Sequence, residues 1–81
     1  MTVHVHLFAR ARDLAGSDSL KVDLSAGATV SDLRQRLSEV CSALAGFLPR
    51  CAVAVNEDFA ADEVTIPADA SVAVIPPVSG G

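Results

Sequence analysis

One amphipathic segment limits the folds open to this chain of 81 residues. Between Thr29 and Gly46, apolar residues recur at the three- and four-residue spacing of a helix that buries one face: Val30, Leu33, Leu37, Val40, Cys41 and Leu44. The opposite face is expected to be exposed, with Ser31, Arg34, Gln35, Arg36, Ser38 and Glu39. Thr29 and Asp32 have the spacing of a capping box, and Gly46 is a residue type that can end a helix. The sequence therefore predicts one long helix over residues 30–44.

Four short segments alternate between apolar and polar residues, as strands with one buried face do. They cover residues 2–8, 20–24, 51–55 and 71–75. In the first segment, Phe8 is expected on the exposed face with His4 and His6. Residues 9–19 are expected to form a connection with room for a helical turn. Residues 59–66 fit either a short edge strand or an irregular loop.

The order of these elements predicts a fold class. One helix can cover one face of a sheet, so the chain should form a two-layer α+β domain. The first and last strands lie on either side of a crossover and could pair in parallel. This is the order of a ubiquitin-like β-grasp fold, with a mixed sheet of four to five strands. We expect a β-grasp domain over residues 1–75 and a flexible tail over residues 76–81.

The tail itself has an unusual composition, Pro76-Pro77-Val78-Ser79-Gly80-Gly81. Proline cannot donate a ladder hydrogen bond, so Pro76 and Pro77 should stop the last strand. Glycine has no Cβ, so Gly80 and Gly81 could enter a narrow channel and present a terminal carboxylate to a partner's active site. The alternative interpretation is a frayed, solvated tail.

Charge and length exclude several classes of function. The formal net charge is −4 and no basic patch is visible, which argues against nucleic acid as a partner. No apolar run is long enough to span a membrane, and residues 1–12 do not resemble a signal peptide. Cys41 and Cys51 do not make a disulfide framework and are expected to be buried thiols, so a cytoplasmic location is the default.

The chain also lacks the groups of a self-sufficient enzyme. His4 and His6 could bind a metal only with a third ligand, and none is evident, so no metal site is predicted. The sequence contains no glycine-rich phosphate loop and no credible nucleophile–base pair. We therefore expect that the chain binds no cofactor and does not bind ATP by itself.

Two stretches resemble the small subunit of molybdopterin synthase, the MoaD family of sulfur carriers. They are Leu7-Phe8-Ala9-Arg10-Ala11-Arg12-Asp13-Leu14-Ala15-Gly16 and Val72-Ala73-Val74-Ile75-Pro76-Pro77-Val78-Ser79-Gly80-Gly81. Between them, Thr29-Val30, Leu33-Arg34, Leu37 and Ala54-Val55-Asn56 follow in the family's order. The turn at residues 68–71 departs from the family's usual Asp-Gly-Asp pattern, which alters the chemistry of the turn but does not touch the tail.

The resemblance implies a mechanism centred on Gly81. A partner adenylyltransferase would activate the Gly81 carboxylate with ATP, and sulfur from a donor enzyme, a sulfurtransferase or desulfurase, would replace AMP to leave a thiocarboxylate. The large synthase subunit would accept the tail and direct the sulfur to precursor Z, the cyclic pyranopterin monophosphate, to build the dithiolene of molybdopterin. This chain would be the non-catalytic, sulfur-donating subunit of a heterotetramer.

The resemblance also implies the docking residues. Phe8, Phe59 and Ile75 match apolar positions that pack against the large subunit, and Arg12 matches an arginine implicated in partner contacts. The tail residues Pro76, Pro77, Val78 and Ser79 would follow Gly80 and Gly81 into the partner. The alternatives are that Phe59 completes a small core and that Arg12 is a solvated loop charge.

Two other functions stay open at this point. One is a β-grasp sulfur carrier for thiamine, cysteine or tRNA thiolation. The other is a ubiquitin-like protein modifier or binding adaptor. Because Lys21 is the sole lysine, chains of such a modifier would have to be linked through Lys21 or the N-terminus.

Overall fold

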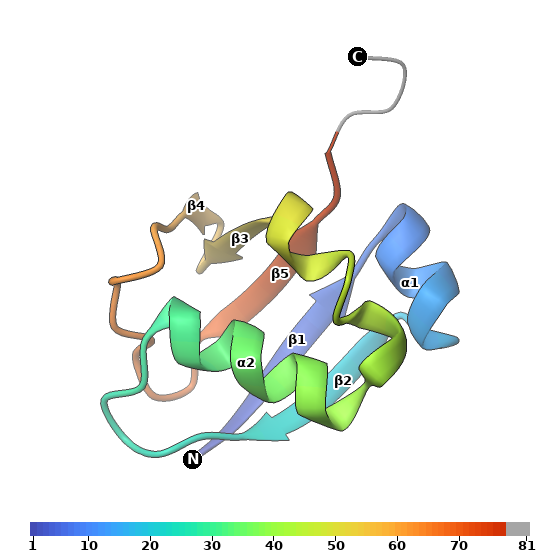
Figure 1. Cartoon of the computed structure of the whole chain (residues 1–81). Coiled ribbons are helices and arrows are strands. Elements are labelled where there is room, and N and C mark those ends of the chain that lie inside the picture. Colours follow the sequence, from blue (N-terminus) through green and yellow to red (C-terminus); the bar gives the residue numbers. More distant parts are fainter. Residues whose placement is uncertain (78–81) are drawn as a thin grey trace.

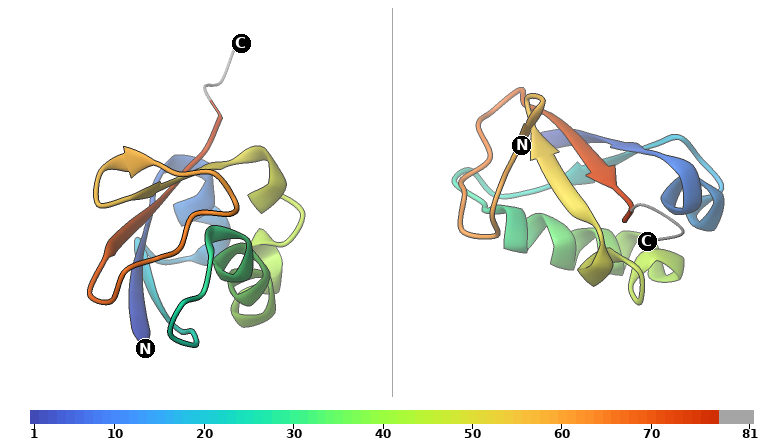
Figure 2. Two further views of the ribbon diagram at one scale, coloured as in Figure 1. Left: turned by 90° about the vertical axis from the view of Figure 1, so that its left-hand side faces the viewer. Right: turned by 90° about the horizontal axis from the view of Figure 1, so that it is seen from above.

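The computed structural model describes residues 1–77, which form one mixed sheet with helices against one of its faces (Figure 1). The elements are β1 (Thr2–Leu7), α1 (Ala9–Ala15), β2 (Ser19–Asp23), α2 (Val30–Val40), the 3-10 turns η1 (Ser42–Leu44) and η2 (Leu48–Arg50), β3 (Ala52–Val55), β4 (Asp58–Phe59) and β5 (Ser71–Ile75). Turned views show that α2 lies against one broad face of the sheet (Figure 2). No helix of residues 1–77 covers the other broad face of the sheet. We call this second surface the open face.

The sheet has the topology that the element order predicts. Its strand order is β2-β1-β5-β3-β4. β1 pairs with β5 in parallel, and the other pairings are antiparallel. The first and last strands are therefore neighbours in the middle of the sheet, and the β-grasp prediction is confirmed.

The core is aliphatic and lies between α2 and the sheet. The alternating strand residues supply one side of it, including Val3, Val5 and Leu7 of β1. Leu33 and Leu37 of α2 supply the other side, and both are fully buried. None of the three phenylalanines is buried. A small domain can therefore close its core without aromatic side chains and keep them for its surface.

The main helix is shorter than predicted. α2 ends at Val40, which is 45% exposed, and Cys41 follows in an extended conformation at φ −137° and ψ 91°. Leu44 still reaches the core, but from η1 rather than from a continuous helix. The chain must turn back here toward β3, and two short 3-10 turns bury Leu44 and Leu48 in succession where a straight helix would carry the chain past the sheet. Gly46 consequently does not end α2.

The start of α2 is fixed from two sides. The capping box is present: the Asp32 N–H donates to Thr29 Oγ1 at 3.3 Å, and the Thr29 N–H donates to Asp32 Oδ2 at 2.9 Å. The N–H groups of Val30 and Ser31 donate to carbonyls of the segment after β4, Val64 and Asp62. These first-turn donors have no partner inside the helix. The segment after β4 is thus an irregular loop, and it satisfies the helix start.

The connection between β1 and β2 contains more helix than predicted. α1 has seven residues, ends at Gly16 in the left-handed conformation (φ 71°), and buries Ala11. Within residues 1–77, neither α1 nor α2 is long and apolar enough to cross a membrane.

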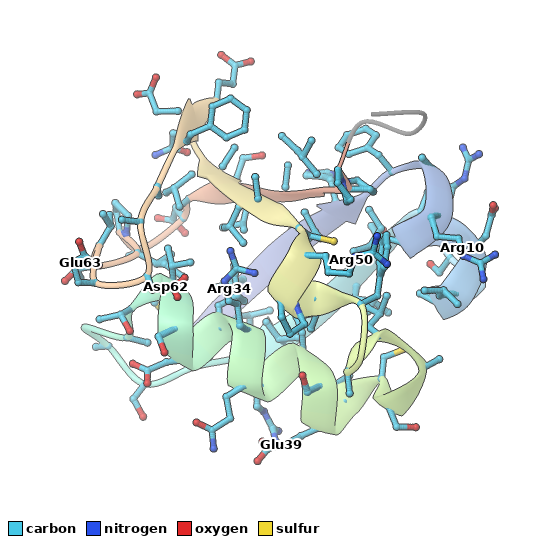
Figure 3. All side chains as sticks on the ribbon, turned by 45° about the horizontal axis from the view of Figure 1, so that its top comes forward. Arg10, Arg34, Glu39, Arg50, Asp62 and Glu63 are labelled. Carbon is cyan, nitrogen blue, oxygen red and sulfur yellow. The ribbon has the colours of Figure 1, made fainter. Side chains whose placement is uncertain are left out.

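Arg34 is the main correction to the predicted exposed face of α2. Its side chain is 21% exposed and projects toward the sheet beside Asp62 (Figure 3). The guanidinium donates from Nη1 to the Leu48 carbonyl at 2.7 Å, from Nη2 to the Cys51 carbonyl at 2.9 Å, and from Nε to Asp62 Oδ1 at 2.9 Å. One cation therefore joins α2 to η2, to the residue before β3 and to the loop after β4.

We expect Arg34→Ala to lower the free energy of unfolding by about 2–3 kcal/mol, because two partly buried carbonyls lose a charged donor. Asp62→Ala is the matched control, since it removes only a 60% exposed ion-pair partner and should change stability by less than about 1 kcal/mol. Urea unfolding followed by circular dichroism measures both. Equal losses in the two variants would contradict the role given to the backbone carbonyls.

Candidate functional site

Three chain segments meet at one end of the strands, where β5 stops. Leu7, the last residue of β1, pairs with Val74, and Ala52, the first residue of β3, pairs with Ile75. The end of β1, the end of β5 and the start of β3 therefore lie side by side, and α1 and η2 flank them (Figure 1). We call this region the tail edge. Pro76 is half-buried and Pro77 is exposed there.

Small and apolar residues make up most of a row across the open face, close to the tail edge. The register places His6, Ala73, Ala54 and Phe59 in one row across four strands. Phe59 is 74% exposed at the end of this row, while Ala54 is buried. Because the two alanine side chains are short, the middle of the row is shallow, and the Phe59 side chain projects above it at one end. The idea that Phe59 completes the core is wrong.

Phe8 stands at the same surface, next to the tail edge. It is 52% exposed, as the alternation of β1 predicts. Ala9 follows in the left-handed region at φ 48°, which non-glycine residues seldom adopt. This turn takes the chain abruptly from β1 into α1, and Phe8 stays outside the core. Ile75, beside the start of β3, is half-buried.

Arg12 lies on the exposed side of α1. It lines a shallow hollow of about 430 Å³ together with His6, Leu7, Phe8, Asp18 and Ser19. The structure thus brings Phe8 and Arg12 together, whereas Phe59 lies on the edge strand β4, three strands away from β1. The remaining predicted site residues, Val78, Ser79, Gly80 and Gly81, lie outside the described residues.

The cysteines and histidines make no second site among residues 1–77. No group of three residues there could hold a metal ion, and His4 and His6 are exposed. Cys51 is buried, and burial raises the pKa of its thiol although Arg34 and Arg50 nearby favour the thiolate. Cys41 is half-buried, not buried as predicted. Cys51 is therefore poorly suited to act as a nucleophile.

Sequence reasoning missed the alanines of the open face and two arginines of the tail edge. The position of Ala54 on the open face could have been predicted, because Ala54 alternates with Val53 and Val55 in β3. The proximity of Arg10 and Arg50 could not have been predicted, because they are 40 positions apart and only the strand register brings them to the tail edge.

The chain matches proteins of one kind over its whole length. The model of the ThiS family matches residues 5–81. A molybdopterin synthase sulfur carrier subunit of Chlamydomonas reinhardtii is 31% identical over 83 residues, with 100% of both chains covered. Its counterpart in Arabidopsis thaliana is 32% identical over 79 residues, covering 98% of this chain and 82% of the plant protein.

Solved structures agree on the fold. SAMP1 of Haloferax volcanii, a small archaeal modifier protein, superposes with a TM-score of 0.91 at 30% identity and full coverage of both chains. A chain in the complex of subunits 1 and 2 of the molybdopterin-converting factor of Helicobacter pylori superposes with a TM-score of 0.72 at 23% identity, also with full coverage of both chains. The family match and the full-length similarity to the two sulfur carrier subunits lead to one assignment: this chain belongs to the ThiS family of ubiquitin-like sulfur carriers.

Proposed function

We propose that this protein is the sulfur carrier subunit of molybdopterin synthase and that its Gly81 carries the sulfur as a thiocarboxylate. The observation that carries the proposal is the tail edge: the chain leaves the central strand β5 beside the open face, where Phe8 and Phe59 are exposed. Full-length similarity to carriers of that name supports it.

The chemistry proceeds in two substitutions, the first at the α-phosphorus of ATP and the second at the Gly81 carbonyl carbon. A carboxylate oxygen attacks the α-phosphorus of ATP in a partner adenylyltransferase, pyrophosphate leaves, and an acyl adenylate forms. A sulfide equivalent from a sulfur donor then attacks the carbonyl carbon, and AMP leaves with the C–O bonding electrons. The product is a thiocarboxylate, which the large subunit directs to precursor Z. ATP is bound by the partner, and this chain's task is to hold the reacting carbonyl in place.

The geometry at the tail edge suits this delivery. Pro76 and Pro77 have fixed φ angles, which lowers the entropy lost when the tail enters a channel. Fully extended, the six residues from Pro76 to Gly81 reach at most about 20 Å. The globular part can therefore dock outside while Gly81 reaches a buried site.

We propose that the large subunit binds the open face. Phe59, Phe8 and Ile75 supply large apolar side chains there, while Ala73 and Ala54 leave the middle low enough for a partner's side chains to enter. Exposed aromatic side chains of this kind are typical anchors of protein interfaces. We also propose a cytoplasmic location, which is compatible with two cysteines that are not cross-linked.

A protein-modifier function is the second candidate, and the superposition with the archaeal modifier protein favours it. In that case Gly81 would form an amide with a target amine instead of accepting sulfur. A sulfur carrier for another pathway would share the first two chemical steps but not the final acceptor.

Incubation with ATP, the activating enzyme of the same organism and a sulfide source should add to the chain the mass of one sulfur-for-oxygen exchange, measured by mass spectrometry. A chain lacking Gly81 should fold equally well by circular dichroism and gain no such mass. Absence of the mass gain in the unaltered chain would reject both carrier functions. Conversion of precursor Z by the thiocarboxylated chain with the large subunit separates molybdopterin synthesis from the other carrier pathways.

We expect Phe59→Ser to weaken binding to the large subunit by at least about 2 kcal/mol, roughly 30-fold in Kd, because a buried aromatic anchor is lost. Val40→Ser is the matched control, since Val40 is also exposed but lies on the helical side. Titration calorimetry measures both affinities, and thermal unfolding should be nearly the same for the two variants. A similar loss of affinity in Val40→Ser would contradict the assignment to the open face.

A further inference from the structure

The basic residues of the chain are unevenly placed. Arg10 and Arg12 lie on α1, which begins directly after β1, and Arg50 is the last residue of η2, directly before β3 begins. Because the end of β1 and the start of β3 both adjoin the end of β5, these three arginines flank the point where the tail leaves the sheet. We call them the tail-edge arginines.

The tail-edge arginines are exposed and have no ion-pair partner among residues 1–77. In contrast, Arg34 pairs with Asp62 and Arg36 pairs with Glu39. An exposed guanidinium without a carboxylate keeps all five of its N–H donors for solvent or for a partner. None of these three charges is therefore used in an ion pair within the described part of the chain.

Arg50 is held in position even though it is exposed. Its Cζ lies over the Phe47 ring, 5.9 Å from the ring centroid, and its backbone N–H donates to the Phe47 carbonyl at 3.0 Å. Stacking on an aromatic ring leaves the edge of the guanidinium free to bind a carboxylate. The stacking already restricts the Arg50 side chain, so less conformational entropy is lost when it binds a partner.

Five of the ten acidic residues lie toward the opposite end of the sheet. Glu57 lies in the β3–β4 turn, Asp58 begins β4, and Asp69 precedes β5, so all three lie where β5 begins. Asp62 and Glu63 lie near the start of α2. Figure 3 shows Arg10 and Arg50 on one side of Arg34, and Asp62 and Glu63 on the other. Two carboxylates accompany the three arginines: Asp13 follows Arg12 in α1, and Asp18 lines the same hollow as Arg12.

We propose that the tail-edge arginines bind a carboxylate-lined rim on the activating adenylyltransferase, around the entrance through which the tail reaches ATP. This inference rests on the proposed function. The acidic rim of the enzyme would attract the arginines at the tail edge and repel the acidic end of this chain. The chain would therefore approach the enzyme with its tail edge foremost. Such steering acts mainly on the association rate.

The activating enzyme is favoured over the large subunit because the two surfaces have different chemistry. An enzyme that must bind and release one carrier after another gains from rapid association, which exposed charges provide. A lasting subunit interface is more hydrophobic, which fits the open face. The charge pattern therefore indicates a separate partner.

The test compares two variants with the same net charge. Arg10→Gln with Arg50→Gln removes two positive charges at the tail edge, and Arg36→Glu changes the net charge equally on the outer face of α2. The probe is the activating enzyme of the same organism with ATP, and pyrophosphate release is measured over a range of chain concentrations. At low ionic strength we expect KM for the double variant to rise about tenfold with kcat within twofold, and KM for Arg36→Glu to change less than about twofold. The difference should disappear at about 0.5 M salt, where screening is strong.

Three outcomes would overturn the proposal. One is an unchanged KM for the double variant, and another is an equal rise for Arg36→Glu, which would reflect net charge alone. The third is an equal loss of affinity for the large subunit, which would remove the assignment to the activating enzyme. If the unaltered chain is not adenylated at all, the proposed function fails as well, so the two failures are distinguishable.

Discussion

The parallel pairing of β1 with β5 is the constraint on which the other features of this protein depend. It places the last strand between β1 and β3, so hydrogen bonds on both sides hold the strand from which the tail departs. It also brings α1 and η2 to the same edge. A terminal strand at the rim of the sheet would leave the tail beside one neighbour only. Central placement gives the tail a rigid base with different surfaces on its two sides.

Much of this fold could be predicted because its signals are local. Alternation in β1 identified which residues are buried, and the capping box at Thr29 located the helix start. The helix end could not be predicted, since the apolar spacing continues through Leu44 although the backbone turns at Cys41. The partial burial of Arg34 could not be predicted either. Its hydrogen-bond acceptors are carbonyls 14 and 17 positions away in the sequence, and no local sequence pattern predicts such distant contacts.

The candidate site divides in the same way. The tail and Phe8 are readable from neighbouring residues, and the exposure of Phe8 follows from strand alternation. Phe59 was ambiguous, because its exposure depends on β4 being a two-residue edge strand. If the open face and the tail-edge arginines serve different partners, both partners still require the same tail. They must then bind in turn, and release from one becomes a condition for docking on the other.

The brevity of β4 has a consequence for the unpartnered chain. An exposed strand edge offers unpaired N–H and C=O groups to a second molecule, and a flat apolar face beside it increases the risk of aggregation. Here one edge strand is only two residues long and begins with Asp58, while the other, β2, contains Lys21 and Asp23. Sheet-to-sheet polymerisation is discouraged at both edges. The protein can therefore keep Phe59 exposed without supplying a template for fibre growth.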